Sequence, residues 1–435
     1  MPMRFARLAA GGLLVGTLLL SQTEDSLTSK QRISRIRDLS RKGTEAIAAL
    51  AEYLGDSDRD IRLEAVKAIV KIDGEASLTP LVRAVHDKDS EIQIRATDGL
   101  VNFYLPGYVA KGGLTGSLTR GVRQVKSYFS SRNDQVVAPD VTIRADVASA
   151  LADEIRTGSG TDARANAARA AGILRAGPAI PALVEVLRAK DSVLIFESLV
   201  ALQKIHDPAA GPGAASAAHD LDERIQAAAL ETIGVLRCLP CAADVRASLA
   251  NAPNIKIRRA ALEALAMLAI ADDRPTFQKY AKDQDPDLQA SALEGLGRLR
   301  EPEDYPLIEE AHNEKDADWR VHLAAAFALV DQGKLDAGDF SPLQYLLENL
   351  DIKSRSNISS AYLTELVRRE DVRRALFPLV PQGTKDQKMA LCAIFAESHS
   401  SDVVPVLQAL LKDVDPDVAS AASRALKIAQ EHPAS

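Results

Sequence analysis

Three stretches of eight residues carry nearly the same pattern: ALETIGVL at 229–236, ALEALAML at 261–268 and ALEGLGRL at 292–299. Each places small and aliphatic residues at the spacing of one helix face, with a glutamate in the third position. The stretches begin 32 and 31 residues apart. Because a helix with this pattern cannot bury its apolar face alone, a repeat of this length predicts a pair of helices that stacks on its neighbours.

The pattern extends along the chain in both directions. Each copy ends on a residue that we call its anchor, which is the fifth residue of the three stretches above. From Ala171 onward, successive anchors are 31 to 34 residues apart, and those outside the three stretches are Leu202, Leu329, Leu363, Ile394 and Leu426. Earlier copies end at Ile69 and Leu100. The chain is 46% apolar and 26% charged but only 4% aromatic. An ordered, all-α fold with an aliphatic core follows, because strands are enriched in β-branched and aromatic residues. We expect an α-α superhelix of about twelve helix pairs.

Aspartate-rich turns separate the two helices of a pair. Examples are DSDRDIR at 56–62, DQDPDLQ at 283–289 and DVDPDVA at 413–419. An aspartate at the N-cap accepts hydrogen bonds from the first free backbone N–H groups of a helix, and proline suits the first helical position. These aspartates are therefore interpreted as helix caps and not as calcium ligands, because the glycine and terminal glutamate of an EF-hand loop are missing.

The register of the repeat places polar residues on two sides of each second helix. Residues seven positions before the anchors, among them Arg62, Gln226 and Gln289, point with the core and are predicted to tie adjacent repeats together. Glu231, Glu263 and Glu294 lie two positions before their anchors, about 200° away, and are predicted to face solvent as one acidic row. This row is either a solvated helix face or a docking stripe for a basic protein partner.

These repeats resemble HEAT-like repeats, specifically the short type of about 31 residues found in phycobilisome-lyase-like proteins. The resemblance covers nearly the whole chain after about residue 30. It implies an α-solenoid whose second helices line a concave surface, in a bacterial protein whose export is expected from its N-terminal segment. The iron-dependent hydroxylases built from such repeats carry His-Glu pairs, which are absent from this sequence.

One insertion of about 40 residues, at 101–140, interrupts the period. Within it SLTRGVRQVKSYFSS at 117–131 predicts a basic amphipathic helix, which either packs on a neighbouring repeat or contacts a protein partner or an anionic membrane surface. Insertions in repeat arrays often mark the binding face. Aromatic and arginine side chains dominate interface energetics, so the candidate contacts in this segment are Tyr104, Tyr108, Arg120, Arg123, Lys126 and Phe129.

The beginning of the chain has the layout of an export signal. Arg4 and Arg7 precede an uncharged run of 13 residues at 8–20, and the polar sequence SQTEDS follows. Because no small-x-small cleavage site ends the run, residues 1–22 are interpreted as a signal peptide or an N-terminal anchor. We therefore expect an extracytoplasmic protein, periplasmic or secreted, with tethering to the inner membrane as the alternative to cleavage. The repeats then occupy 23–100 and 141–430 as one continuous solenoid.

The quartet Cys238-Leu239-Pro240-Cys241 is the one motif in the sequence that could take part in thiol–disulfide chemistry. It is compatible with a local disulfide, with two free thiols or with a redox site, although the βαβ context of thioredoxin-like proteins is missing. Zinc needs four ligands, and only His219 lies near this quartet, so no metal and no small-molecule cofactor is expected. With 53 Lys and Arg against 60 Asp and Glu, nucleic acid is also disfavoured as a partner.

The sequence therefore favours a non-catalytic scaffold or adaptor of the cell envelope. It would bind other proteins through the solenoid surface and the 101–140 insertion. Two alternatives stay open at this point. One is an accessory enzyme, either phycobilisome-lyase-like or redox-active through Cys238 and Cys241, and the other is a peripheral membrane protein bound through 117–131.

Overall fold

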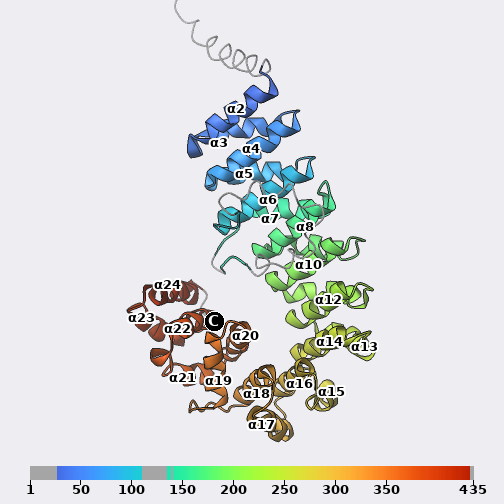
Figure 1. Ribbon diagram of the computed structural model, residues 1–435, viewed down its shortest axis with the longest axis vertical. Helices are drawn as coiled ribbons and strands as arrows, with labels where there is room; N and C mark the ends of the chain where they lie inside the picture. The colour runs from blue at the N-terminus through green and yellow to red at the C-terminus, as the bar shows by residue number, and fades with distance from the viewer. Residues whose placement is uncertain (1–26, 110–134, 139–140, 432–435) are drawn as a thin grey trace, which may run out of the picture. The chain divides into compact units, whose positions relative to one another are not determined.

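The computed structural model of the chain describes residues 27–109, 135–138 and 141–431, and within them all regular secondary structure is helical (Figure 1). This confirms the predicted all-α superhelix: 23 α-helices, α2 to α24, occur in the described residues, with short 3-10 turns between many of them. Eleven pairs, α3–α4 to α23–α24, follow α2, in agreement with the expected number. No helix among these residues is long and apolar enough to cross a membrane.

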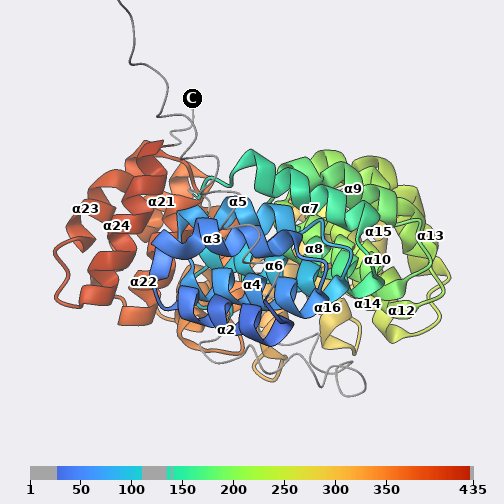
Figure 2. The same ribbon diagram turned by 90° about the horizontal axis from the view of Figure 1, so that it is seen from above.

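The contacts group the chain into two compact units, Met1–Ile205 and His206–Ser435. In the first unit the second helices α2, α4, α6, α8 and α10 pack on one another in series, as the stacked blue and green ribbons show (Figures 1 and 2). The helices of this unit are α2 (Ser29–Ser40), α3 (Ile47–Glu52), α4 (Arg59–Ile72), α5 (Glu75–Ala84), α6 (Ser90–Tyr104), α7 (Ala145–Thr157), α8 (Thr161–Ile173), α9 (Ile180–Val186) and α10 (Ser192–Ile205).

The second unit repeats this arrangement with α12, α14, α16, α18, α20, α22 and α24 as the packed series. Its helices are α11 (Gly211–Ala214), α12 (Glu223–Val235), α13 (Ala242–Ala250), α14 (Ile255–Leu268), α15 (Arg274–Tyr280), α16 (Pro286–Leu299), α17 (Tyr305–Asn313), α18 (Trp319–Asp331), α19 (Pro342–Glu348), α20 (Ser356–Leu366), α21 (Glu370–Leu376), α22 (Lys385–Ala396), α23 (Val404–Leu410) and α24 (Pro416–Glu431). The single continuous solenoid stays a prediction.

The aspartate-rich turns cap the second helices as predicted. The Asp58 carboxylate accepts a hydrogen bond from the N–H of Asp60 at 2.9 Å, and the N–H of Asp58 donates to Asp56 at 2.8 Å. Asp285 and Asp283 repeat both bonds at the start of α16, at 3.1 and 2.9 Å. The first aspartate thus fixes the turn and the second caps the helix, which explains why the two recur together.

Small residues let neighbouring second helices approach closely. A Cβ atom added at Gly297 of α16 would lie 2.6 Å from the Cα of Ala328 in α18, and one at Gly172 of α8 would lie 2.7 Å from the Cα of Ala201 in α10. Both glycines directly follow a core anchor, so the close approach recurs at one position of the repeat. The predicted aliphatic core is therefore a close-packed interface between second helices, which leaves little room for aromatic rings.

The polar residues seven positions before the anchors divide between hydrogen bonds inside their own pair and bonds to a neighbouring pair. The side-chain amides of Gln226 and Gln289 each donate to a carbonyl eight positions earlier, in the segment that directly follows the preceding first helix. The prediction that they bridge adjacent repeats is therefore wrong for these two. It holds for Arg62, whose guanidinium pairs with Asp87 of the next pair at 2.7 Å. Buried carbonyls at the end of a helix need a donor, and the nearest ones are local.

Candidate functional site

A groove of about 720 Å³ lies on the second helices of the second unit. Its walls come from α12, α14, α16, α18 and α20, so five successive second helices contribute to one site. This is the surface that the resemblance to HEAT-like repeats indicates as concave. Apolar residues, including Val235, Met267 and Ile358, alternate in the lining with arginines and carboxylates. The lining therefore offers both apolar contacts and charged groups to a bound molecule.

Helix α20 forms one wall and is held there by a charged network. Glu365 on α20 accepts hydrogen bonds from Arg298 on α16 and from Arg237 after α12, each at 2.7 Å. Burial would raise the pKa of Glu365, but the hydrogen bonds and charges of the two arginines outweigh it and lower the pKa to about 2. Glu365 is therefore ionised at any physiological pH, and the network stays charged.

Tyr362 lies one turn before Glu365 and adds a second contact between α20 and α16. Its hydroxyl donates to Glu294 at 2.6 Å, and its ring stacks on Phe327 with 4.5 Å between centroids. Arg298 also pairs with Glu294 and lies 4.8 Å above the Phe327 ring. Burial and the neighbouring Glu294 carboxylate raise the pKa of the Tyr362 phenol, so it remains a hydrogen-bond donor.

The three glutamates of the predicted acidic row occupy different environments. Glu231 and Glu263 are exposed, as expected, whereas Glu294 is only 7% exposed because Arg298 and Tyr362 cover it. The expectation that Glu294 faces solvent is therefore wrong. The groove side chains around Glu263 displace part of its water and, with the charges of Glu294 and Glu231, raise the pKa of Glu263 to about 7.

The predicted contacts of the insertion fall partly within the described residues. Tyr104 lies at the end of α6, where its hydroxyl accepts a hydrogen bond from the N–H of Arg144 at 3.1 Å. Tyr108 is 7% exposed, which leaves little of its ring for a partner. Arg120, Arg123, Lys126 and Phe129, together with the whole predicted helix 117–131, lie outside the described residues. Their role in partner contact stays a prediction.

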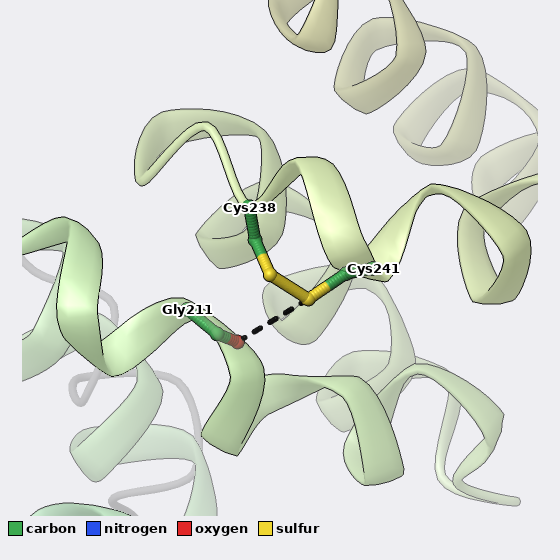
Figure 3. Close-up of a disulfide and its surroundings, with 3 residues drawn as sticks. All are labelled: Gly211, Cys238 and Cys241. Carbon is green, nitrogen blue, oxygen red and sulfur yellow. Dashed lines mark hydrogen bonds between the residues drawn. A yellow bond between two sulfur atoms is a disulfide. The ribbon is translucent and has the colours of Figure 1, made fainter.

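Cys238 and Cys241 form a disulfide in the turn before α13 (Figure 3). The sulfur atoms are buried, with 3% and 2% of the residues exposed. They face the preceding pair, where the carbonyl oxygen of Gly211 lies 3.7 Å from Cys241 Sγ. The third cysteine, Cys392, is a buried free thiol whose pKa burial raises to about 11. Among the described residues no group of three or more His, Cys, Asp and Glu side chains is arranged to hold a metal ion.

The repeat pattern does not reveal the groove residues of α20, because this pair departs from the repeat. Its copy of the motif reads SSAYL at 359–363, with a tyrosine beside the anchor where the other copies have small or aliphatic residues. That tyrosine is Tyr362, the residue that reaches Glu294. The tyrosine beside the anchor marks this pair as unusual in the sequence. Its partner, Glu294, lies 68 positions away and could not be identified from the pattern.

The fold and the groove define the chain as an α-solenoid of the kind that presents extended surfaces for binding. The family profile for HEAT repeats matches residues 17–101 and 243–330. Together with the helix pairs that continue between and beyond these stretches, this match shows that the chain is a HEAT-like repeat protein. None of the curated proteins matches the sequence.

Several solved structures are similar at low identity. The complex of CpcE and CpcF of phycocyanin lyase from Nostoc sp. PCC7120 is 17% identical over 62% of this chain and 92% of that chain, with a TM-score of 0.37. A structure of Kap121p is 14% identical over 88% of this chain and 45% of that chain, with a TM-score of 0.38. A structure from a study of the cadherin and beta-catenin interaction is 12% identical over 92% and 96%, with a TM-score of 0.38.

Proposed function

We propose that this protein is a non-catalytic scaffold or adaptor of the cell envelope, and that a partner protein binds in the groove of its second unit. The groove is the observation that carries this proposal. Five second helices contribute to its lining, and the lining combines apolar side chains with charged ones. Buried apolar contacts supply most of the affinity of a protein interface, whereas charged groups supply much of the specificity.

Two features support a location outside the cytoplasm. The N-terminal segment has the basic start and short apolar run of an export signal. The disulfide between Cys238 and Cys241 belongs to a class of bond that persists in oxidising compartments and is rare in the cytosol. A redox role for this pair is disfavoured, because exchange requires an accessible thiolate and both residues are at most 3% exposed.

Site-specific photo-crosslinking in the source organism tests the binding role. Ile358 lines the groove and is 37% exposed, whereas Ile352 is 39% exposed and does not line it, so the two form a matched pair. With p-benzoylphenylalanine at residue 358, we expect a discrete protein adduct on illumination. The same group at residue 352 should give none. An equal set of adducts from both positions, or none from residue 358, would contradict the proposed site.

The location is tested separately by fusing alkaline phosphatase, which is active only after export, to the chain after residue 30. We expect phosphatase activity from the wild-type fusion and its loss when the apolar run at 8–20 is deleted. An inactive wild-type fusion that is nevertheless synthesised would contradict the envelope role. It would leave the groove untouched as a binding site.

A further inference from the structure

The charges that line the groove are almost all paired within the chain. Each of four arginines has a carboxylate partner: Arg237 with Glu365 at 2.7 Å, Arg298 with Glu365 at 2.7 Å, Arg259 with Asp287 at 2.8 Å, and Arg320 with Asp287 at 3.3 Å. Glu294, as described above, is held by Arg298 and Tyr362. Internal pairing of this kind leaves those groups little capacity to recognise another molecule.

Glu263 is the exception among the carboxylates of the groove. It lies in the middle of α14 and lines the groove, yet it makes no hydrogen bond and no ion pair with any residue that the structure describes. The charges that act on it most strongly include the carboxylates of Glu294, Glu231 and Asp287, which are opposed by Arg298. A carboxylate that lies among other carboxylates and has no ion pair of its own is a group that a cation would stabilise.

The side chains that line the groove with Glu263 indicate which kind of cationic group would fit there. Met267 follows one helical turn later on the same face of α14, and Val235 and Ile358 line the same groove. An apolar surface next to a carboxylate matches a side chain with an aliphatic stem and a cationic head. Lysine and arginine are the protein side chains of that form, whereas a metal ion would need several oxygen ligands in place of the methionine and valine.

We infer that the groove binds a lysine or arginine side chain of the partner protein, with the cationic head on Glu263 and the stem against Met267 and Ile358. This inference rests on the proposed function, because it names the chemistry by which that partner is recognised. Arg368, two residues after the end of α20, lines the groove, is exposed and forms no ion pair with the described residues. Its positive charge disfavours a run of lysines, so the partner presents an isolated cation and not a polybasic segment.

Zero-length crosslinking tests this inference with the full-length protein. The probe is a pentapeptide, Ac-Ala-Ala-Lys-Ala-Ala-amide, at about 1 mM, a concentration that suits weak binding of a short peptide. A water-soluble carbodiimide joins its ammonium group to a carboxyl group with loss of water, and mass spectrometry of the digest locates the amide. We expect Glu263 to be the main site, ahead of the fully solvated Glu314, and we expect Glu263→Gln to remove this adduct while Glu314→Gln leaves it.

Competing peptides separate binding from the inherent reactivity of Glu263. An analogue with arginine in place of lysine keeps the cation but does not couple, and in excess it should lower the yield at Glu263 about tenfold. A norleucine analogue keeps the stem without the charge and should not compete. Equal competition by the two analogues, or labelling spread over exposed carboxylates without preference for Glu263, would overturn the inference.

The outcome can be separated from that of the proposed function. A photo-adduct from residue 358 that is unchanged by Glu263→Gln, together with unselective peptide labelling, would leave the groove as a binding site but remove its cation specificity. Selective labelling of Glu263 without any photo-adduct in the source organism would instead leave the cation site and remove the proposed partner complex. Circular dichroism of each variant checks that the helical fold is intact.

Discussion

Glu154 in the first unit should make stability fall as the pH rises. Its side chain on α7 is 1% exposed and accepts one hydrogen bond, from the Thr97 hydroxyl at 2.6 Å. The other carboxyl oxygen is buried and has no hydrogen-bond partner among the described residues. Burial, with the neighbouring Asp98, raises the pKa of Glu154 from 4.5 to about 8, although the Thr97 hydrogen bond opposes this. The folded chain therefore keeps this carboxyl protonated at neutral pH.

The magnitude follows from proton linkage. An unfolded chain loses this proton near pH 4.5 and the folded chain near pH 8, so the folded state binds more protons between these values. The stability contributed by the neutral carboxyl is complete below pH 4.5 and falls by about 1.4 kcal/mol per pH unit above it, a loss of about 3 kcal/mol by pH 7. The substitution Glu154→Gln carries no ionisable proton and should remove this loss.

Thermal unfolding followed by circular dichroism from pH 5 to pH 8 measures the effect. For a unit of about 200 residues, 1 kcal/mol shifts the midpoint by about 2 to 4 °C, so the Glu154→Gln variant should exceed the wild type by about 6 to 12 °C at pH 7. Near pH 5 the two should differ little. The exposed Glu52→Gln serves as the control and should follow the wild-type curve. Parallel curves for wild type and Glu154→Gln across this range would refute a buried neutral carboxyl at this position.

Two further predictions concern packing and the cysteines. Gly297→Ala should lower the free energy of unfolding in a urea titration by about 1 to 3 kcal/mol, because the new methyl group would meet the backbone of the next second helix. The better helix propensity of alanine does not offset this clash. Gly338→Ala, which has open space around it, should leave the free energy of unfolding unchanged in the same titration. A thiol assay should detect no reactive cysteine in the folded protein and one, Cys392, after denaturation. Denaturation with a reductant should raise the number to three, because Cys238 and Cys241 form a disulfide. Three thiols in the denatured protein without reductant would contradict this disulfide.

The repeat itself could be predicted because its causes are local. A helix with apolar residues on one face must pack on a neighbour, and an Asp-x-Asp turn caps the next helix by hydrogen bonds that span two or three residues. The phase of the repeat, the caps and the positions of close helix approach all depend on such short spacings. For the same reason the long insertion at 101–140 was visible as a break in the period.

The groove could not be predicted, because its contacts join distant positions. Arg237 and Glu365 are 128 residues apart, and Arg298 and Glu365 are 67 apart. No spacing in the sequence specifies that the side of α20 carrying Tyr362 and Glu365 meets α16. The buried Glu154 escaped notice for a related reason, since a glutamate at this point of an amphipathic helix does not reveal which oxygen finds a partner.

The glutamates of the repeat show most directly which properties depend on the sequence alone and which depend on the tertiary structure. The sequence by itself determined the helix pairs, their caps and the placement of Glu263 and Glu294 at the same position of adjacent second helices. Only the tertiary structure decided that Glu294 is covered by Arg298 and Tyr362 while Glu263 remains open in the groove. The physical reason is that helix periodicity fixes the direction of a side chain from its near neighbours, whereas its partner and its exposure depend on which remote helix packs opposite it.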